Sequence, residues 1–202
     1  MPGMRKKGGR GMGLSDEEKN ILLEIARKGV RDAVRGVEEP PKDRRIFLHD
    51  ELMKRKGVFV TLERKGELQG CIGEIWPKNP LWLGVYLHAI DAAIHDPRFA
   101  PVEEKDLPYI DIEITVLSVP EEMHYSDWRE VLEKLVPHKH GVILKRGYNL
   151  ATYLPQVWEH FQDKEEFLQN LAIKAGMLPE EWKKSQIFIY YAEEIIKGKF
   201  KE

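Results

Sequence analysis

The sequence contains a single cysteine, Cys71, among its 202 residues, so no disulfide can form within the chain. No apolar run approaches the roughly 18 residues of a membrane-spanning helix, and the N-terminal residues lack the apolar core of a signal peptide. These absences lead us to expect a protein of the reducing cytoplasm with no membrane segment. Charge of one sign is not in excess either, because 32 Lys and Arg residues are balanced by 34 Asp and Glu residues. No overall positive field is therefore available to hold nucleic acid.

Several catalytic motifs are also missing. The chain has no phosphate-binding P-loop, no G-x-G-x-x-G loop, no G-x-S-x-G nucleophile elbow, no C-x-x-C pair and no H-E-x-x-H zinc motif. The commonest nucleotide-binding, hydrolase and zinc-protease classes are thus not indicated. What is present fits a globular protein, since 42% of the residues are hydrophobic. A charged fraction of 33%, with few Asn and Gln residues, favours a thermophilic source.

The first thirteen residues differ from the rest, with five glycines, four basic residues and no acidic one. We expect a flexible basic arm over residues 1–13, which could contact the phosphates of RNA. The alternatives are a solvated tail without function and a native start at Met12. Residues 14–202 have the length of one domain.

Hydrophobic periodicity predicts several helices and two β-hairpins. The first helix is expected to begin after Ser15, which forms a capping box with Glu18, and to fade near Gly36. Further helices are expected around residues 47–52, 81–95, 128–135 and 163–175, hairpins over 57–72 and 142–154, and single strands over 109–119 and 187–191. Hairpins separated by helices, without regular β-α-β alternation, predict an α+β fold around a mainly antiparallel sheet with flanking helices.

The most informative segment surrounds the cysteine and reads Leu-Gln-Gly-Cys-Ile-Gly over residues 68–73. Strand periodicity places Gln69, Cys71 and Gly73 on one face, and Gly70 and Gly73 leave room for close approach of a ligand. A catalytic thiol needs a cation, a histidine or a helix N-terminus to lower its pKa, and none is adjacent in sequence. The alternative is a cysteine that only packs in the core.

Other polar residues are candidate binding groups. Arg98 follows a proline turn and could present its guanidinium to a phosphate or carboxylate, or form a structural pair with Glu113 or Asp111. Tyr153 and Gln156 lie at the end of the second hairpin, where they could hydrogen-bond a ligand or pack with satisfied polar ends.

The histidines offer two patterns typical of metal ligands, neither of them sufficient. His138 and His140 would point the same way in an extended backbone, but two ligands do not make a site. His88, Asp91 and His95 share a helical face, which is more often simply solvated. We therefore predict no metal site.

Seven short segments, taken in order, resemble the AMMECR family. They are Gly57-Val58-Phe59-Val60-Thr61-Leu62, Leu68-Gln69-Gly70-Cys71-Ile72-Gly73, Asp96-Pro97-Arg98-Phe99, Ile112-Glu113-Ile114, His140-Gly141, Leu154-Pro155-Gln156-Val157 and Lys174-Ala175-Gly176. The resemblance covers about residues 15–195. The family motif usually reads Leu-Arg-Gly-Cys-Ile-Gly, so Gln69 stands where an arginine is expected.

The resemblance implies an α+β domain with two lobes and a cleft, in which both chain ends build the larger lobe and a smaller lobe is helical. Members of the family are often encoded beside, or fused to, a Memo-like protein, and near a radical SAM protein. This association suggests a shared modification pathway and makes both proteins candidate partners, although no activity of the family is established.

Two functional hypotheses follow. In the first, the chain is an enzyme or a substrate-handling subunit, with Cys71 as nucleophile or thiol carrier and His140 as base. Arg98 or Gln156 would then orient the substrate, and Gly70 and Gly73, beside Cys71, would permit close backbone approach. In the second, the chain is a non-catalytic binding module for a partner protein or RNA. No cofactor is indicated.

Overall fold

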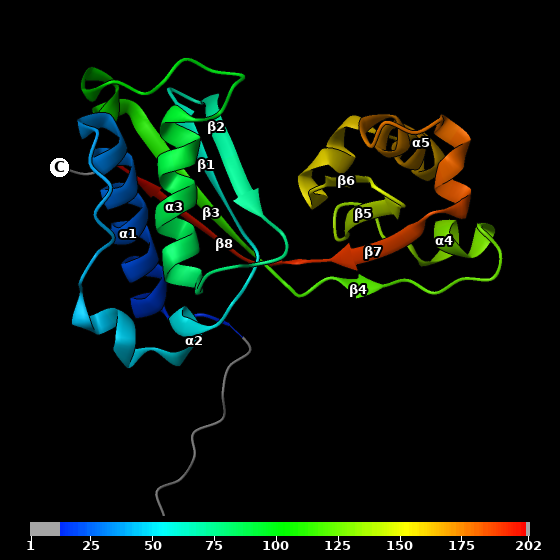
Figure 1. The fold of residues 1–202 in the computed structure, drawn as a ribbon, viewed down its shortest axis with the longest axis horizontal. Coiled ribbons are helices and arrows are strands. Elements are labelled where there is room, and N and C mark those ends of the chain that lie inside the picture. The colour runs from blue at the N-terminus through cyan, green and yellow to red at the C-terminus, as the bar shows by residue number, and fades with distance from the viewer. Residues whose placement is uncertain (1–12, 201–202) are drawn as a thin grey trace, which may run out of the picture.

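The computed structural model describes residues 13–200 as two lobes, each built on a four-stranded sheet (Figure 1). The first sheet has the strand order β2-β1-β3-β8 and the second the order β4-β7-β5-β6, and every pairing is antiparallel. The strands are β1 (Val58–Arg64), β2 (Glu67–Glu74), β3 (Ile110–Leu117), β4 (Glu121–Glu122), β5 (Gly141–Arg146), β6 (Asn149–Tyr153), β7 (Gln186–Tyr190) and β8 (Ala192–Lys199). The predicted α+β class is confirmed.

In the first lobe, helices α1 (Asp16–Arg35) and α3 (Leu81–Ile94) pack together on one face of the sheet. Ser15 and Glu18 form the predicted capping box, and Gly36 ends α1 in the left-handed conformation with φ 65°. Alternate β1 residues, from Val58 to Leu62, are fully buried against these helices. The remaining helical elements here are η1 (Arg44–Leu48), α2 (Asp50–Met53) and η2 (Glu104–Tyr109).

The second lobe has its own core of aromatic residues. Trp158 stacks on Phe167 with ring centroids 3.6 Å apart, and Trp182 is fully buried in the same cluster. These residues come from its helical elements, which are α4 (Arg129–Lys134), η3 (Pro155–His160), α5 (Lys164–Lys174) and η4 (Pro179–Lys184). Each sheet thus buries one face under its own helices.

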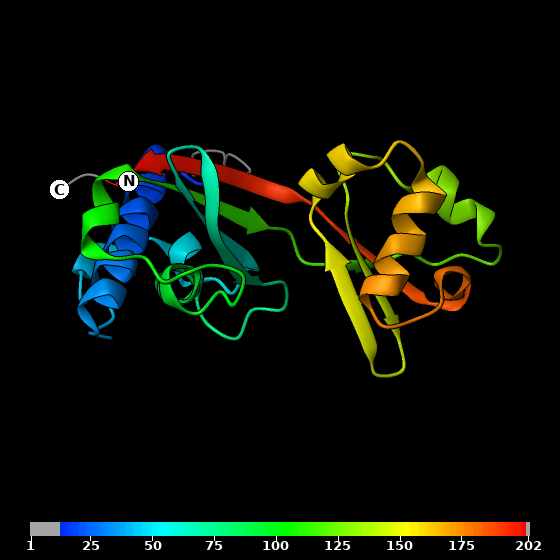
Figure 2. The same ribbon diagram turned by 90° about the horizontal axis from the view of Figure 1, so that it is seen from above.

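The chain passes between the lobes twice, from β3 to β4 and from β7 to β8, so that both ends of the described chain belong to the first lobe (Figure 2). A small cluster joins the lobes at this crossing, and we call it the joint cluster. It consists of Ile75, Leu117, Ile143 and Tyr190, with Phe59, Leu154 and Phe188 packed against it. Trp76 of the first lobe also meets Phe188 of the second edge to face, with centroids 6.2 Å apart.

The sequence reading missed two strands. β8 follows β7 after one residue and crosses back to the first sheet, where it pairs with β3. β4 is only two residues long and pairs with β7. The predicted arm over residues 1–13 lies outside the described residues except for Gly13. Within residues 13–200, no helix has both the length and the apolar character needed to cross a membrane.

Candidate functional site

Cys71 lies on the edge strand β2, on the face of the first sheet that is turned away from α1 and α3. It is directly opposite Thr61, whose hydroxyl donates a hydrogen bond of 3.2 Å to the sulfur. The same register continues through Glu113 of β3 to Lys197 of β8, whose ammonium lies 2.7 Å from the Glu113 carboxylate. A thiol, a hydroxyl, a carboxylate and an ammonium therefore form one row across the sheet.

Asp96 and Arg98 cover the open edge of β2 at the cysteine. The Asp96 carboxylate accepts the backbone N–H of Cys71 at 2.9 Å, and Arg98 Nη2 donates to the Cys71 carbonyl at 3.3 Å. The two side chains also bind each other, with Arg98 Nε and Nη2 donating to the two oxygens of Asp96 at 2.9 and 2.7 Å. The alternative in which Arg98 pairs with Glu113 or Asp111 is therefore wrong, because a carboxylate two residues earlier is already in position.

This bidentate contact leaves the third guanidinium nitrogen of Arg98, Nη1, without a hydrogen bond among the described residues. The Arg98 side chain is 56% exposed, whereas that of Asp96 is 2% exposed. The hydrogen bonds from Arg98 lower the pKa of Asp96 to about 2, so this carboxylate is ionised at neutral pH. Asp96 thus fixes an arginine whose free end faces solvent beside Cys71.

The thiol itself is not activated. Burial raises the pKa of Cys71 above its usual value, and the Thr61 hydrogen bond and the charge of Arg98 only partly offset this. Cys71 is half-buried and is protonated at neutral pH. A nucleophilic role would therefore need a base that removes the proton.

His140, the predicted base, lies in the second lobe. It is buried, its Nδ1 accepts the backbone N–H of Val136, and its ring packs edge to face on Tyr191. Burial lowers the pKa of His140, so its imidazole is neutral at pH 7. No hydrogen bond or ring contact among the described residues joins it to Cys71. The extended backbone that would align His138 with His140 does not form, because His138 lies in a turn with φ 62°.

The two glycines of the motif have a packing reason. A Cβ on Gly70 would lie 2.0 Å from the backbone carbonyl oxygen of Ala92 in α3. A Cβ on Gly73 would lie 2.3 Å from the carbonyl oxygen of Val58 and 2.5 Å from the Phe59 ring. What approaches these glycines is the protein itself. Direct ligand contact at either position stays a prediction.

Gln69 departs from the expected strand alternation. The β1–β2 register shifts at this point, with Leu62 opposite Gly70 and Glu63 opposite Leu68, so that Gln69 is the extra residue of a β-bulge. Its side chain is buried and donates a 2.7 Å hydrogen bond to the carbonyl of Ala100. The residue that replaces the family's arginine thus ties β2 to the 98–101 loop.

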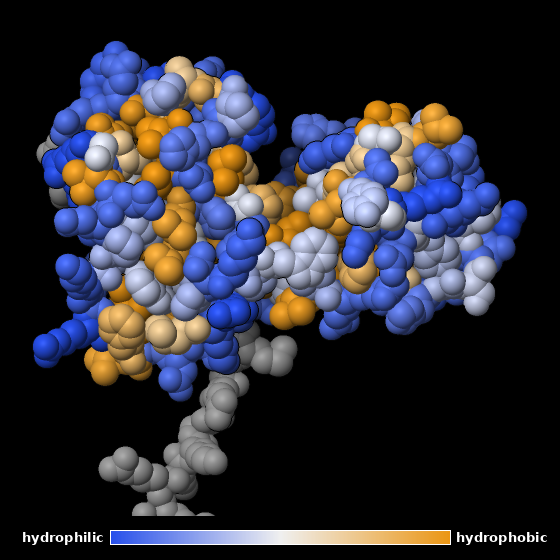
Figure 3. Space-filling model, in the orientation of Figure 1, coloured by the Kyte–Doolittle hydropathy of each residue, from blue (hydrophilic) through white to orange (hydrophobic). Residues whose placement is uncertain are grey.

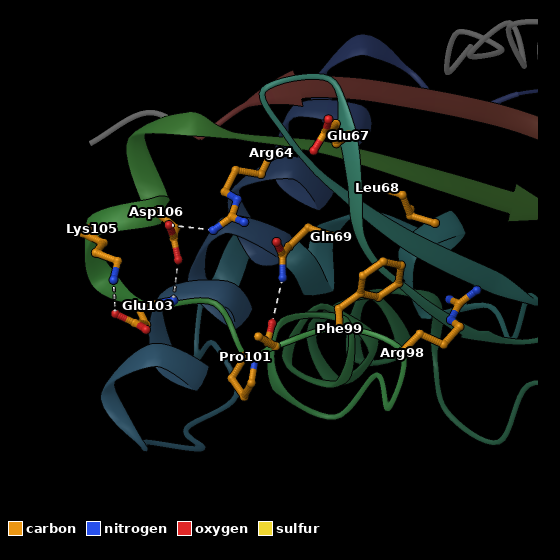
Figure 4. A pocket seen from close by; sticks show the side chains of 11 residues that line it. Arg64, Glu67, Leu68, Gln69, Arg98, Phe99, Pro101, Glu103, Lys105 and Asp106 are labelled. Atoms are coloured by element: carbon orange, nitrogen blue, oxygen red, sulfur yellow. Dashed lines mark hydrogen bonds and ion pairs between the residues drawn. The ribbon is translucent and has the colours of Figure 1, made fainter.

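A cavity of about 440 Å³ lies between this part of β2 and the loop (Figure 4). Its lining includes Gln69, Phe99 and Arg98, and two basic residues at its far end. Both of these are paired, Arg64 with Asp106 at 3.0 Å and Lys105 with Glu103 at 2.7 Å. The cavity volume suits a small ligand. Arg98 lines it and also contacts the Cys71 backbone, so the two features are continuous.

Figure 3 shows a hollow between the two lobes. Lys174, at the end of α5, donates to the Thr152 carbonyl of β6 at 2.9 Å and lies over the Tyr153 ring at 4.7 Å. Burial and the nearby charge of Arg98 lower the pKa of Lys174. We call this hollow between the two lobes the cleft.

The structure therefore unites some of the predicted residues and separates others. Gln69, Gly70, Cys71, Gly73, Arg98 and Glu113 cluster on the first lobe, and Tyr153 lies at the end of β6 in the second lobe. Gln156 is exposed in η3 and has no hydrogen bond among the described residues, and His140 lies apart from Cys71. The sequence analysis did not name Lys174 as a candidate, although the family segment Lys174-Ala175-Gly176 contains it.

The helical face with His88, Asp91 and His95 forms as predicted. Asp91 contacts His95 at 2.8 Å and lies 3.8 Å from His88, and Glu74 lies 3.6 Å from the other side of the His88 ring. Across residues 13–200, no group of three or more His, Cys, Asp or Glu side chains is arranged to hold a metal ion.

Comparison with known proteins places this geometry in context. The family model AMMECR1 matches residues 23–195. A protein of Methanosarcina acetivorans is 36% identical over 188 residues, which cover 92% of this chain and 94% of that protein. A protein of Methanothermobacter thermautotrophicus is 40% identical over 170 residues, covering 83% of this chain and 86% of that protein. Thermophiles are among the sources of the relatives, in keeping with the charged composition.

A solved structure is also similar. The crystal structure of the uncharacterised protein PH0010 from Pyrococcus horikoshii superposes with a TM-score of 0.77 and 30% sequence identity. The match covers 92% of this chain and 98% of the other, so both lobes are included.

Proposed function

Because this chain belongs to the AMMECR1 family, we propose that it is a substrate-handling protein whose small-molecule or side-chain ligand binds in the cleft beside Cys71 and Arg98. It would act as an enzyme or as the subunit of one, in a modification pathway with a Memo-like or radical SAM partner. The protein's own contribution is to bind and orient the ligand.

One observation carries this proposal, namely the way Arg98 is held. An exposed arginine normally loses rotamer freedom when it binds a ligand. Here Asp96 already fixes the guanidinium in two hydrogen bonds and leaves Nη1 free beside the thiol. The Arg98 side chain therefore loses its rotamer freedom when the protein folds and not when a ligand binds, as in a preorganised binding site.

Cys71 enters this function as a protonated thiol. In that form it is a weak hydrogen-bond donor that contacts the ligand, and it becomes a nucleophile only when a ligand or partner group accepts its proton. The group that accepts the Cys71 proton would then not be His140, because the His140 ring is bound to the Val136 N–H in the other lobe.

The test is the pH profile of iodoacetamide alkylation at Cys71, the single thiol of the chain, followed by mass spectrometry. We expect reaction in the folded protein, with a midpoint above the value of about 8.5 of an ordinary thiol. Substitution R98Q should raise the midpoint further, because it removes a cation that favours the thiolate.

R129Q is a matched control. Arg129 also pairs with an aspartate two residues earlier, Asp127, but in the second lobe. It should leave the Cys71 profile unchanged. A midpoint well below 8.5 would contradict the proposal and mean that Cys71 is an activated nucleophile. Alkylation only after unfolding would mean that Cys71 is buried and contacts no ligand.

A second candidate function is a non-catalytic binding module for a partner protein. The packed glycines favour it, because their conformational cost is explained without a ligand. In this case C71A would retain a captured Memo-like partner with unchanged affinity, whereas the substrate-handling role predicts that ligand binding is lost. RNA retained through the basic arm would disappear on removal of residues 1–13, with partner binding unchanged.

A further inference from the structure

Strand β8 forms the open edge of the first sheet. It is the last strand in the order β2-β1-β3-β8, and it runs along the outside of the first lobe in Figure 2. The other sheet edges are shielded, because Asp96 and Arg98 bind the β2 backbone, Lys174 binds a β6 carbonyl, and β4 is only two residues long. Among residues 13–200, one side chain binds the β8 backbone, that of Arg27, which donates to the Lys199 carbonyl at 3.0 Å.

The register of β8 against β3 shows which of its backbone groups point outward. In an antiparallel pair, every second residue exchanges both of its hydrogen bonds with the partner strand. The Phe200 N–H donates to the Ile110 carbonyl at 2.8 Å, so the even-numbered residues of β8 bond to β3. The N–H and C=O groups of Ile195 and Lys197 therefore point away from the sheet, as the Lys199 carbonyl does. These four groups are available to another strand.

The side chains on the open face of β8 match a second copy of the same strand. Ile195 is 51% exposed, with Glu193 two residues before it and Lys197 two residues after it. In a two-fold antiparallel pairing centred on Ile195, the two isoleucines lie opposite each other, and Glu193 of each copy lies opposite Lys197 of the other. Opposite charges in this position stabilise a strand pair. A pairing centred on Glu193 or Lys197 would instead place like charges opposite each other.

Both charged residues can reach a second copy. Glu193 lies 2.6 Å from Lys56, and Lys197 lies 2.7 Å from Glu113. The side chains of Glu193 and Lys197 nevertheless remain 40% and 72% exposed. Each therefore keeps solvent-exposed atoms beside β8 for a contact between copies.

We propose that two copies of this chain associate through β8, paired antiparallel about a two-fold axis at Ile195, so that their four-stranded sheets become one continuous sheet. In such strand addition, main-chain hydrogen bonds supply the affinity and side chains set the register. One strand pair is smaller than a standard protein interface, so the dimer is reversible and depends on concentration. Cys71 lies on β2, the opposite edge of the sheet, and stays accessible in the dimer.

Sedimentation velocity over a concentration series tests this association. We expect a monomer–dimer equilibrium that E193K and K197E each weaken about fivefold or more, because the two-fold axis changes two charge pairs at once. The double variant E193K/K197E should restore dimerisation, since opposite charges again face each other across the copies. Its restoration cannot come from Lys56 or Glu113, which would then face like charges. K145E, at an exposed lysine on β5 of the second lobe, should dimerise as the wild type does.

A disulfide tests the register, with Cys71 replaced by serine so that each variant has one thiol. Residues in a hydrogen-bonded antiparallel pair have Cα atoms about 5.5 Å apart, which is within the range of a disulfide. C71S/I195C should therefore form a covalent dimer on oxidation, whereas C71S/K199C, on the same strand, should remain monomeric. A monomer at every concentration, equal dimerisation of E193K, K197E and K145E, or equal cross-linking of the two cysteine variants would overturn the proposal.

Discussion

At the scale of single residues, Asp96 has the most connections in the site. Its carboxylate receives the Cys71 N–H, the Arg98 backbone N–H and two guanidinium donors. Edge strands expose unpaired backbone groups, and here a carboxylate and a guanidinium take the place of a neighbouring strand. Asp96 is therefore a positioning residue for both Arg98 and the edge of β2.

We predict that D96N lowers the free energy of unfolding at pH 7 by about 1.5–3 kcal/mol, the usual contribution of hydrogen bonds to a buried charged group. The pKa of Asp96 is about 2 in the folded protein and near 3.9 in an unfolded chain. Its charged form therefore stabilises the fold above pH 4, and this contribution is lost as the pH falls toward 2. Denaturant titrations of both proteins at pH 7, 4 and 3 should show the difference shrinking.

The control is D127N, which removes the exposed Asp127–Arg129 pair of similar spacing. Exposed ion pairs contribute at most about 1 kcal/mol. Equal losses for D96N and D127N, or a D96N effect that does not change with pH, would contradict the assigned role of Asp96.

At the scale of elements, the β1–β2 hairpin is fixed by backbone requirements at both ends. Its turn uses left-handed conformations at Lys65 and Gly66, with φ 54° and 82°. Further along, Gly70 lets β2 lie against the backbone of α3, which places Cys71 on the opposite face. The position of the thiol thus depends on a helix contact made by its neighbour.

Substitution G70A tests this dependence. The added Cβ would lie 2.0 Å from the Ala92 carbonyl oxygen, and such overpacking typically costs about 1–3 kcal/mol. We expect this loss in thermal or denaturant unfolding, with β2 displaced and Cys71 alkylated faster. G84A in α3 is the control, because its Cβ would meet two side-chain atoms, a Val58 methyl at 3.2 Å and Glu74 Oε1 at 3.9 Å, and no backbone, and alanine favours a helix. If G70A is as stable as the wild type, the helix contact does not require Gly70, and close approach of a ligand becomes the better explanation for this glycine.

The features that could be predicted from the sequence are those set by neighbouring residues, and the missed ones depend on contacts between residues far apart in the chain. Local signals such as the Ser15 cap and the Gly66 turn correctly indicated the helices and hairpins. β8 was missed because its adjacent Glu193 and Glu194 and its lysines break the alternating pattern of a strand and resemble a solvated segment. Its pairing with β3 is also distant in sequence. Lys174 was missed for the same reason, since the charge of Arg98, which belongs to the other lobe, acts on it only in the folded chain.

At the scale of the whole molecule, the lobes have separate cores and meet at the joint cluster. Ile75 and Leu117 come from the first lobe and Ile143 and Tyr190 from the second. Tyr190 also bonds back to β6, with its hydroxyl 2.9 Å from Thr152 Oγ1 and 3.1 Å from the Tyr153 carbonyl. The geometry of the cleft therefore depends on a few residues at the crossing.

We predict that L117A uncouples the unfolding of the two lobes. Leu117 is fully buried in the joint cluster, and a buried Leu→Ala substitution removes about 2–5 kcal/mol of packing energy. Cys71 alkylation reports on the first lobe, and tryptophan fluorescence reports mainly on the second, which holds Trp128, Trp158 and Trp182. Along a denaturant series the two signals should coincide in the wild type and separate in L117A.

The comparison variant is L171A, which truncates a fully buried leucine in the core of the second lobe alone. If the joint cluster transmits stability between the lobes, L171A lowers both midpoints together, because the intact joint still couples them. Transitions that coincide in L117A would mean that the two chain crossings alone couple the lobes. Transitions already separate in the wild type would mean that the two lobes unfold independently and that the joint cluster does not couple them.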